Sequence, residues 1–222
     1  MCRSNDAIDK NEVITNTIAY VQNALEGEGT GHDWWHIDRV TKLTKKIAEK
    51  ENANMFICIM AALLHDIADE KLNESEKIGI KKVRSWLASQ SVDHEATEQI
   101  MDIITSISFK GGNGLQLNSV EAKVVQDADR LDAIGAIGIA RCFVYSGATS
   151  SPIHDPFIKP REHMTKEEYR HNKSTAINHF YEKLLKLKDL MNTETGKQLA
   201  IERHRFMEMF LDEFYEEWEG RR

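Results

Sequence analysis

The chain has 222 residues, of which 41% are hydrophobic and 29% are charged, and its formal net charge at pH 7 is −7. This length and composition exclude a disordered chain and predict one globular domain with a sizeable core. The acidic balance argues against nonspecific binding to nucleic acid or to an anionic membrane surface, because both need a basic surface. The longest apolar run, residues 55–64, is about half as long as a bilayer-spanning helix, so no membrane span is expected.

The three cysteines, Cys2, Cys58 and Cys142, lie far apart and form no C-x-x-C pair. This spacing argues against a disulfide framework and against a thiolate zinc site. The N-terminal residues show no apolar block followed by a small-residue cleavage site, so no secretory signal is expected. We therefore expect a cytoplasmic protein.

Apolar residues recur at spacings of three and four, and all three prolines fall between residues 152 and 160. Both features predict an all-α fold, a helical bundle without strands. The expected helices, in chain order, are 11–25, 34–51, 55–65, 74–89, 95–106, 119–134, 137–145, 166–191 and 196–218.

Turn-forming residues predict loops at 27–31, around 111–114 and at 146–161. The last loop is longer than most connections, and loops of that length usually cover or bind a site. Its clustered prolines favour a semi-rigid cover. Thr165 and Glu168 have the spacing of a capping box, where a helix is expected to resume. We predict one domain over residues 1–222, with a core at about 31–145 on which the loop and two C-terminal helices pack.

Polar residues occupy core positions of the helical pattern at three places. His36 and Asp127 each share a helix face with apolar residues at spacings of three and four, and the apolar run at 55–64 leads directly into His65 and Asp66. A lone buried carboxylate must be protonated, paired or bound to a metal, because its desolvation is costly.

Each of these positions also has a structural interpretation. A single buried histidine is more often a hydrogen-bonded core residue than a ligand, and a buried aspartate is about as often an ion-pair partner. Together, however, two imidazoles and two carboxylates form a mixed nitrogen and oxygen set. Such a set suits Mn, Fe, Co, Ni, Zn or Mg.

Three segments around these positions carry a family resemblance. They read GHDWWHIDRV at 31–40, ALLHDI at 62–67 and QDADRLDAIG at 126–135. In this order they resemble the H…HD…D signature of the HD superfamily. The text IHDP at 153–156 and HFYEKL at 179–184 is similar to one branch of bacterial HD hydrolases, so the resemblance extends from about residue 31 to the last helix.

The resemblance implies a helical bundle in which His36, His65, Asp66 and Asp127 hold the metal. It also implies hydrolysis of phosphomonoesters or phosphodiesters, including nucleotide pyrophosphohydrolysis in some similar proteins. HD enzymes with two metals have two further histidines between the HD pair and the last aspartate, whereas only His94 lies in that interval here. One divalent ion (Mn, Mg, Co, Ni, Fe or Zn) is therefore expected.

A carboxylate one helical turn from the HD pair is a candidate for orienting and deprotonating the attacking water. Asp69 lies four residues after His65, where many family members have glutamate, and Glu70 is the alternative. For both carboxylates the structural interpretation is a solvated loop residue.

Phosphate oxygens need cations in addition to the metal. The alternative for these cations is ordinary ion pairing, since Asp129 and Asp132 flank Arg130. The candidates for substrate binding are Arg130, Lys110, Arg39, Arg141 and His32, the last of which could instead cap a helix.

These features together predict a metal-dependent phosphohydrolase that acts on a nucleotide or a related small phosphate ester, by attack of activated water on phosphorus. Nucleoside triphosphate pyrophosphohydrolysis is one form of this activity. The alternatives are a phosphodiesterase for a signalling nucleotide and a non-catalytic nucleotide sensor. No nucleic-acid partner or membrane is expected, and a homodimer is left open.

Overall fold

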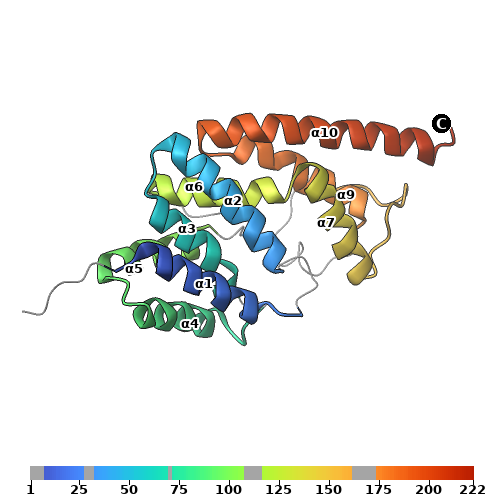
Figure 1. Ribbon diagram of the computed structural model, residues 1–222. Coiled ribbons are helices and arrows are strands. Elements are labelled where there is room, and N and C mark those ends of the chain that lie inside the picture. Colours follow the sequence, from blue (N-terminus) through green and yellow to red (C-terminus); the bar gives the residue numbers. More distant parts are fainter. Residues whose placement is uncertain (1–7, 28–32, 70–71, 108–116, 162–173) are drawn as a thin grey trace, which may run out of the picture.

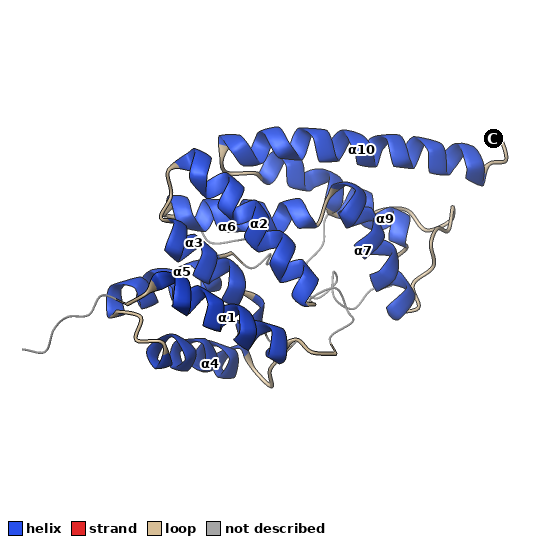
Figure 2. Ribbon diagram, in the orientation of Figure 1, coloured by secondary structure: helices blue, strands red, loops and turns tan. Residues whose placement is uncertain are grey.

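The computed structural model describes residues 8–27, 33–69, 72–107, 117–161 and 174–222. Over these residues the structure is helical and contains no strand, which confirms the predicted all-α class (Figure 2). The helices are α1 (Lys10–Ala24), α2 (Trp34–Glu51), α3 (Met55–Leu64), η1 (Asp66–Ala68), α4 (Glu76–Ser89), α5 (His94–Ser106), α6 (Val120–Asp132), α7 (Gly135–Ala148), α9 (Ala176–Glu182), η2 (Leu184–Leu190) and α10 (Glu194–Trp218); η1 and η2 are 3₁₀ helices.

Most predicted helices agree with the structure to within two or three residues at each end, and α2 agrees at both ends. The expected helix at 166–191 is the exception. Its described part is divided at Lys183, whose backbone leaves the helical region (φ −138°, ψ −59°). The shorter elements α9 and η2 therefore replace one long helix, and the proposed capping box at 165–168 lies outside the described residues.

Helix α3 is central because its sequence is apolar on all sides. Every residue from Phe56 to Leu64 is buried, and α1, α2, α5 and α6 pack around them. Helix α10 crosses the bundle along α6 and α7 (Figure 1). Helix α3 therefore ends inside the bundle, where α2 and α6 pack against it and against each other.

The loop after α7 begins three residues later than predicted, because α7 continues to Ala148. Its backbone accepts hydrogen bonds from the start of α9, at Pro152 O (from Ala176 N, 3.0 Å) and Ile153 O (from Ile177 N, 3.0 Å). The His154 ring packs among three aromatic side chains of α10, those of Phe214, Tyr215 and Trp218. These contacts hold this loop against the C-terminal helices.

Among the residues described, no single helix is both long and apolar enough to cross a bilayer. The pair α6 and α7, bent by 66°, passes such a test by length and composition alone.

Candidate metal centre

Three predicted ligands come together where α3 ends. His36 lies in the first turn of α2, His65 follows the last residue of α3, and Asp66 begins η1. One ligand atom from each of them lies within 4.8 Å of the other two, and His36 and Asp66 are buried. The start of α2 is fixed by Asp33, whose carboxylate accepts a hydrogen bond from the backbone N–H of His36 (2.9 Å).

The turn that carries Asp66 is supported by α4. Gly79 of α4 lies directly against the Ala68 carbonyl, and a Cβ at this position would collide with it. The Asn73 side chain donates hydrogen bonds to Ile67 O (2.9 Å) and Asp69 O (2.8 Å). Close packing and these two hydrogen bonds therefore fix the position of η1, which directly follows His65 in the chain.

A hydrogen bond shows which nitrogen of the His65 ring carries a proton. Nδ1 lies 2.8 Å from the Ala62 carbonyl, which can only accept, so Nδ1 carries the proton. Nε2 is buried, lies 3.3 Å from Asp66 Oδ1, and has no hydrogen-bond partner among the residues described. Burial by itself would lower the pKa of His65, but the carboxylates of Asp66 and Asp129 outweigh it and the net shift is upward.

The His36 ring points its two nitrogens at different aspartates of α6. Nδ1 lies 2.7 Å from Asp132 Oδ2, while Nε2 lies 3.5 Å from Asp66 Oδ2 and 3.5 Å from Asp129 Oδ1. Asp129 Oδ1 is also 4.0 Å from His65 Nε2. Asp129 is thus the aspartate of α6 that joins the cluster, with 35% of its side chain exposed.

The position of Asp127 corrects the prediction that it is the fourth ligand. Its carboxylate points to the start of α10, where it accepts hydrogen bonds from Asn192 N (2.9 Å), Asn192 Nδ2 (2.8 Å), Thr193 N (2.7 Å) and Thr193 Oγ1 (2.7 Å). Asp127 is fully buried and is compensated by these donors at a helix N-terminus. Residues 127 and 129 point about 200° apart around a helix, so one of them cannot replace the other.

The residues of the cluster fit a divalent cation. Two imidazole nitrogens and two carboxylates form the mixed set that such ions bind, and the described cluster contains no thiolate. The buried His65 Nε2 without a hydrogen-bond partner is the observation that a bound cation would explain. His94 lies outside this centre, since its side chain is 91% exposed beside Glu98 on α5.

Asp132 forms ion pairs with two of the arginines predicted to bind phosphate. Arg39 donates from Nε to Oδ1 (2.7 Å) and from Nη2 to Oδ2 (3.0 Å), and Arg141 donates from Nη1 to Oδ2 (2.7 Å). Burial would raise the pKa of Asp132, but the hydrogen bonds from His36 and Arg39 hold it well below its usual range. Arg39 and Arg141 are therefore engaged in ion pairs with Asp132.

The other predicted residues lie as follows. Arg130 donates a hydrogen bond to the Leu190 carbonyl of η2, and burial lowers its pKa, so its guanidinium faces the C-terminal elements. Asp69 is half-buried beside His65, whose pKa its carboxylate helps to raise. His32, Glu70 and Lys110 lie outside the described residues.

Two basic residues near the centre were not predicted as site residues. Lys183, at the break between α9 and η2, lies close enough to Asp129 and Arg141 for both to act on its pKa, which burial lowers. His179 lies one turn earlier, and burial together with the charge of Lys183 lowers its pKa to about 4. The segment HFYEKL was the only sequence signal for these residues.

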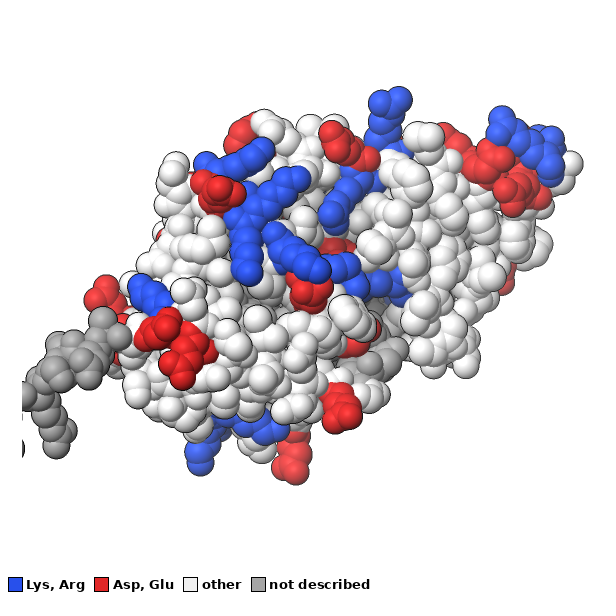
Figure 3. All heavy atoms as spheres, viewed as in Figure 1, with Lys and Arg blue, Asp and Glu red and all other residues white. Residues whose placement is uncertain are grey.

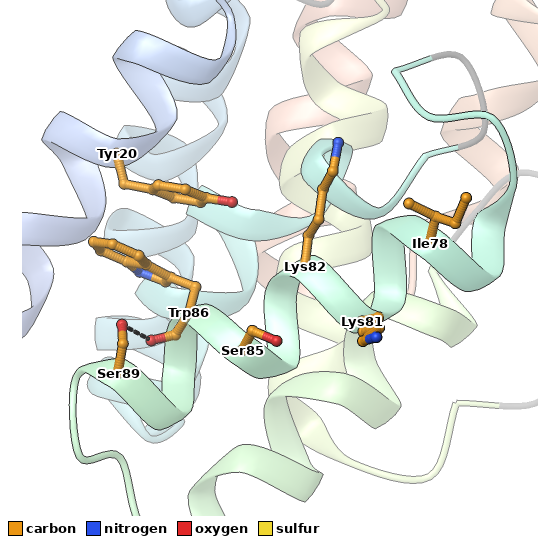
Figure 4. Close-up of a pocket in the computed structure, with 7 residues that line it drawn as sticks. All are labelled: Tyr20, Ile78, Lys81, Lys82, Ser85, Trp86 and Ser89. Carbon is orange, nitrogen blue, oxygen red and sulfur yellow. Dashed lines mark hydrogen bonds between the residues drawn. The ribbon is translucent and has the colours of Figure 1, made fainter.

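Two features of the surface lie apart from the cluster residues. Lys and Arg side chains gather over α2 on the face shown in Figure 3, interspersed with acidic ones, although the chain is acidic overall. A groove of about 440 Å³ lies between α1 and α4, lined in part by Lys82 and by the stacked rings of Tyr20 and Trp86 (Figure 4). It contains none of the cluster residues.

Residues 34–134 match the HD domain family model, and this match spans all the ligands of the cluster. The chain belongs to the HD superfamily of metal-dependent phosphohydrolases, which confirms the resemblance found in the sequence.

Several known proteins are similar along nearly the whole chain. YpgQ of Bacillus subtilis is 41% identical over 194 residues, which cover 86% of this chain and 87% of YpgQ. The crystal structure of an HD-superfamily hydrolase from Bacillus thuringiensis is 48% identical with a TM-score of 0.78, over 95% of this chain and 99% of that one. The crystal structure of YpgQ in complex with ADP has a TM-score of 0.76 at 38% identity, over 94% and 96% of the two chains.

Proposed function

We propose that the protein hydrolyses a phosphate ester of a nucleotide at a single divalent cation held by His36, His65, Asp66 and Asp129. The observation that carries the proposal is the cluster itself, in which the buried His65 Nε2 faces two carboxylates and a second imidazole. The relative YpgQ has been crystallised with ADP, which supports a nucleotide as the substrate class.

The surrounding residues supply what hydrolysis at phosphorus needs. A divalent cation at such a site polarises a phosphate oxygen and lowers the pKa of water. We assign Asp69, beside His65, to orienting the attacking water and accepting its proton. The Lys183 ammonium lies close enough to Asp129 for the charge of that carboxylate to act on its pKa, and we assign it to the phosphate oxygens. Asp129 is partly exposed, so the cluster is open to a substrate on that side.

The test is a panel of nucleoside mono-, di- and triphosphates and cyclic nucleotides, each incubated with Mn²⁺, Mg²⁺, Co²⁺ or Ni²⁺. Phosphate and pyrophosphate are quantified separately, so the assay identifies both the bond cleaved and the metal. We expect metal-dependent release from at least one nucleotide, and none from Asp129→Asn. Release only from cyclic nucleotides would instead indicate a phosphodiesterase.

Tight nucleotide binding without any product would contradict hydrolysis and favour the sensor. Equal product from the wild type and Asp129→Asn would show that the cluster does not carry the activity.

A further inference from the structure

Asp132 joins three helices at a single carboxylate. It is the last residue of α6 and is 1% exposed, and its partners His36 and Arg39 come from α2 and Arg141 from α7. Oδ1 accepts from Arg39 Nε, while Oδ2 is shared by His36 Nδ1 (2.7 Å), Arg39 Nη2 (3.0 Å) and Arg141 Nη1 (2.7 Å). Four donors on two oxygens fix the orientation of this carboxylate.

We propose that Asp132 is the positioning residue of the metal centre: it fixes His36 as the Nδ1–H tautomer, so that the Nε2 lone pair faces Asp66 and Asp129. The proposal rests on the ligand set of the proposed function. A neutral imidazole carries one proton, and a carboxylate held by two arginines can only accept, so the proton lies on Nδ1. A carboxylate partner also makes the opposite ring nitrogen a more basic ligand.

The two histidines of the cluster differ in what orients them. His65 is oriented by a backbone carbonyl, that of Ala62, which substitution of a side chain leaves in place. His36 depends on a side chain that is itself held by Arg39 and Arg141. These two arginines therefore act on the metal through Asp132, in addition to any contact with substrate.

The informative variant is Asp132→Asn, which keeps the shape and exchanges one acceptor oxygen for an NH₂ group. An amide cannot accept on both sides, so either the Arg39 Nε–H or the group of donors around Oδ2 meets another donor. In the first case the His36 Nδ1–H keeps an acceptor, but a neutral amide oxygen makes the opposite ring nitrogen a less basic ligand than a carboxylate does. In the second case the His36 Nδ1–H loses its acceptor altogether, so both cases weaken the metal centre.

The matched control is Glu182→Gln. Glu182 is also buried, and it accepts from Arg161 Nε (2.9 Å) and Nη2 (2.8 Å) in a separate ion pair. Both variants remove one charge from a buried carboxylate held by an arginine, and both are expected to lower the melting temperature. Only Asp132→Asn is expected to weaken the metal centre.

The experiment is a titration of the full-length protein with Mn²⁺, with thermal unfolding measured on the same samples. Asp132→Asn is expected to bind Mn²⁺ about 10- to 100-fold more weakly than the wild type, the effect of losing an outer-sphere partner. Glu182→Gln should bind it as the wild type does. Wild-type Mn²⁺ affinity in folded Asp132→Asn would overturn the proposal, and so would an equal loss of affinity in both variants.

Arg39→Lys provides a second route if Asp132→Asn does not fold. Lysine keeps the charge but cannot reproduce the two-pronged contact with Asp132. We expect a smaller loss of Mn²⁺ affinity, since Arg141 still holds the carboxylate; an unchanged affinity would overturn the proposal.

A wild type that binds Mn²⁺ but hydrolyses no nucleotide would refute the proposed function and leave this inference standing.

Discussion

Two faces of α6 carry aspartates with opposite surroundings. On the face toward α10, Asp127 is enclosed by hydrogen-bond donors from Asn192 and Thr193. On the face toward α2, Asp129 lies beside the Nε2 atoms of two histidines and near a second carboxylate, that of Asp66. The first carboxylate is compensated by the chain itself, whereas the second belongs to a group of electron-pair donors that a cation would hold together.

The comparison shows that burial alone does not identify a metal ligand. Asp127 is fully buried and caps a helix, while the more exposed Asp129 joins the cluster. A structural carboxylate is recognised by donors that satisfy both of its oxygens. A ligand is recognised by neighbouring imidazole nitrogens and carboxylates that can share a cation with it. The partial exposure of Asp129 leaves a path for a substrate to reach the metal, while His36 and Asp66 stay buried.

The largest expected effect is a loss of folding stability when Asp127, the carboxylate enclosed by hydrogen-bond donors, is removed. Asp127→Ala leaves the buried N–H groups of Asn192 and Thr193 without their acceptor, so the free energy of unfolding should fall by about 3 to 5 kcal/mol, because each unsatisfied buried donor costs about 1 to 3 kcal/mol. Urea unfolding measures this loss. The folded fraction should still bind Mn²⁺; a stable variant that has lost the metal would restore Asp127 as a ligand.

The second largest expected effect is a loss of metal affinity when Asp129 is removed. Asp129→Ala should weaken Mn²⁺ binding by more than about 100-fold, or about 2.7 kcal/mol, because a direct ligand contributes more than an outer-sphere partner. Its stability without metal should change less than that of Asp127→Ala, since the lost attraction to Lys183 is offset by relief of the repulsion between Asp129 and Asp66. Isothermal titration and urea unfolding of the same variant test both statements. A large loss of stability with intact Mn²⁺ binding would place Asp129 with the structural carboxylates.

The smallest effect concerns the pH dependence of stability and another buried carboxylate, that of Glu182. Burial would raise its pKa, but hydrogen bonds from Arg161 and Ser174 outweigh this, and the pKa lies below the ordinary value of 4.5. Its stabilising contribution is therefore complete above about pH 4.5 and is lost as the pH falls through the lowered pKa. The difference in unfolding free energy between the wild type and Glu182→Gln should accordingly shrink in acid. A difference that stays constant from neutral to acidic pH would show that Glu182 is not held as an ion.

Much of the site could be predicted from the sequence. The apolar run that ends at His65 and Asp66 placed two ligands at the end of a buried helix, and His36 occupied a core position of an amphipathic one. Both inferences hold because α2 has one buried face and α3 has no exposed one. The structure brings these three residues together as that pattern predicts.

The choice among the aspartates of α6 could not be made in this way. Periodicity selects a ligand only if a helix has one buried face, but α6 packs against α2, α3 and α10 and is buried on most of its surface. Asp127 and Asp132 are both buried, yet one meets the start of α10 and the other meets His36. Asn192 and Thr193 lie more than 60 residues from Asp127 in the chain, and His36 and Arg39 lie more than 90 residues from Asp132.

The sequence by itself therefore determined the helical class, the family and the chemical types in the centre, because periodicity and residue type are local properties. Only the tertiary structure decided which aspartate joins His36, His65 and Asp66, which one caps α10, and that Arg39 and Arg141 bind Asp132. The role of a carboxylate depends on which donors, acceptors and charges surround it, and distant segments of the chain supply those groups only after it has folded.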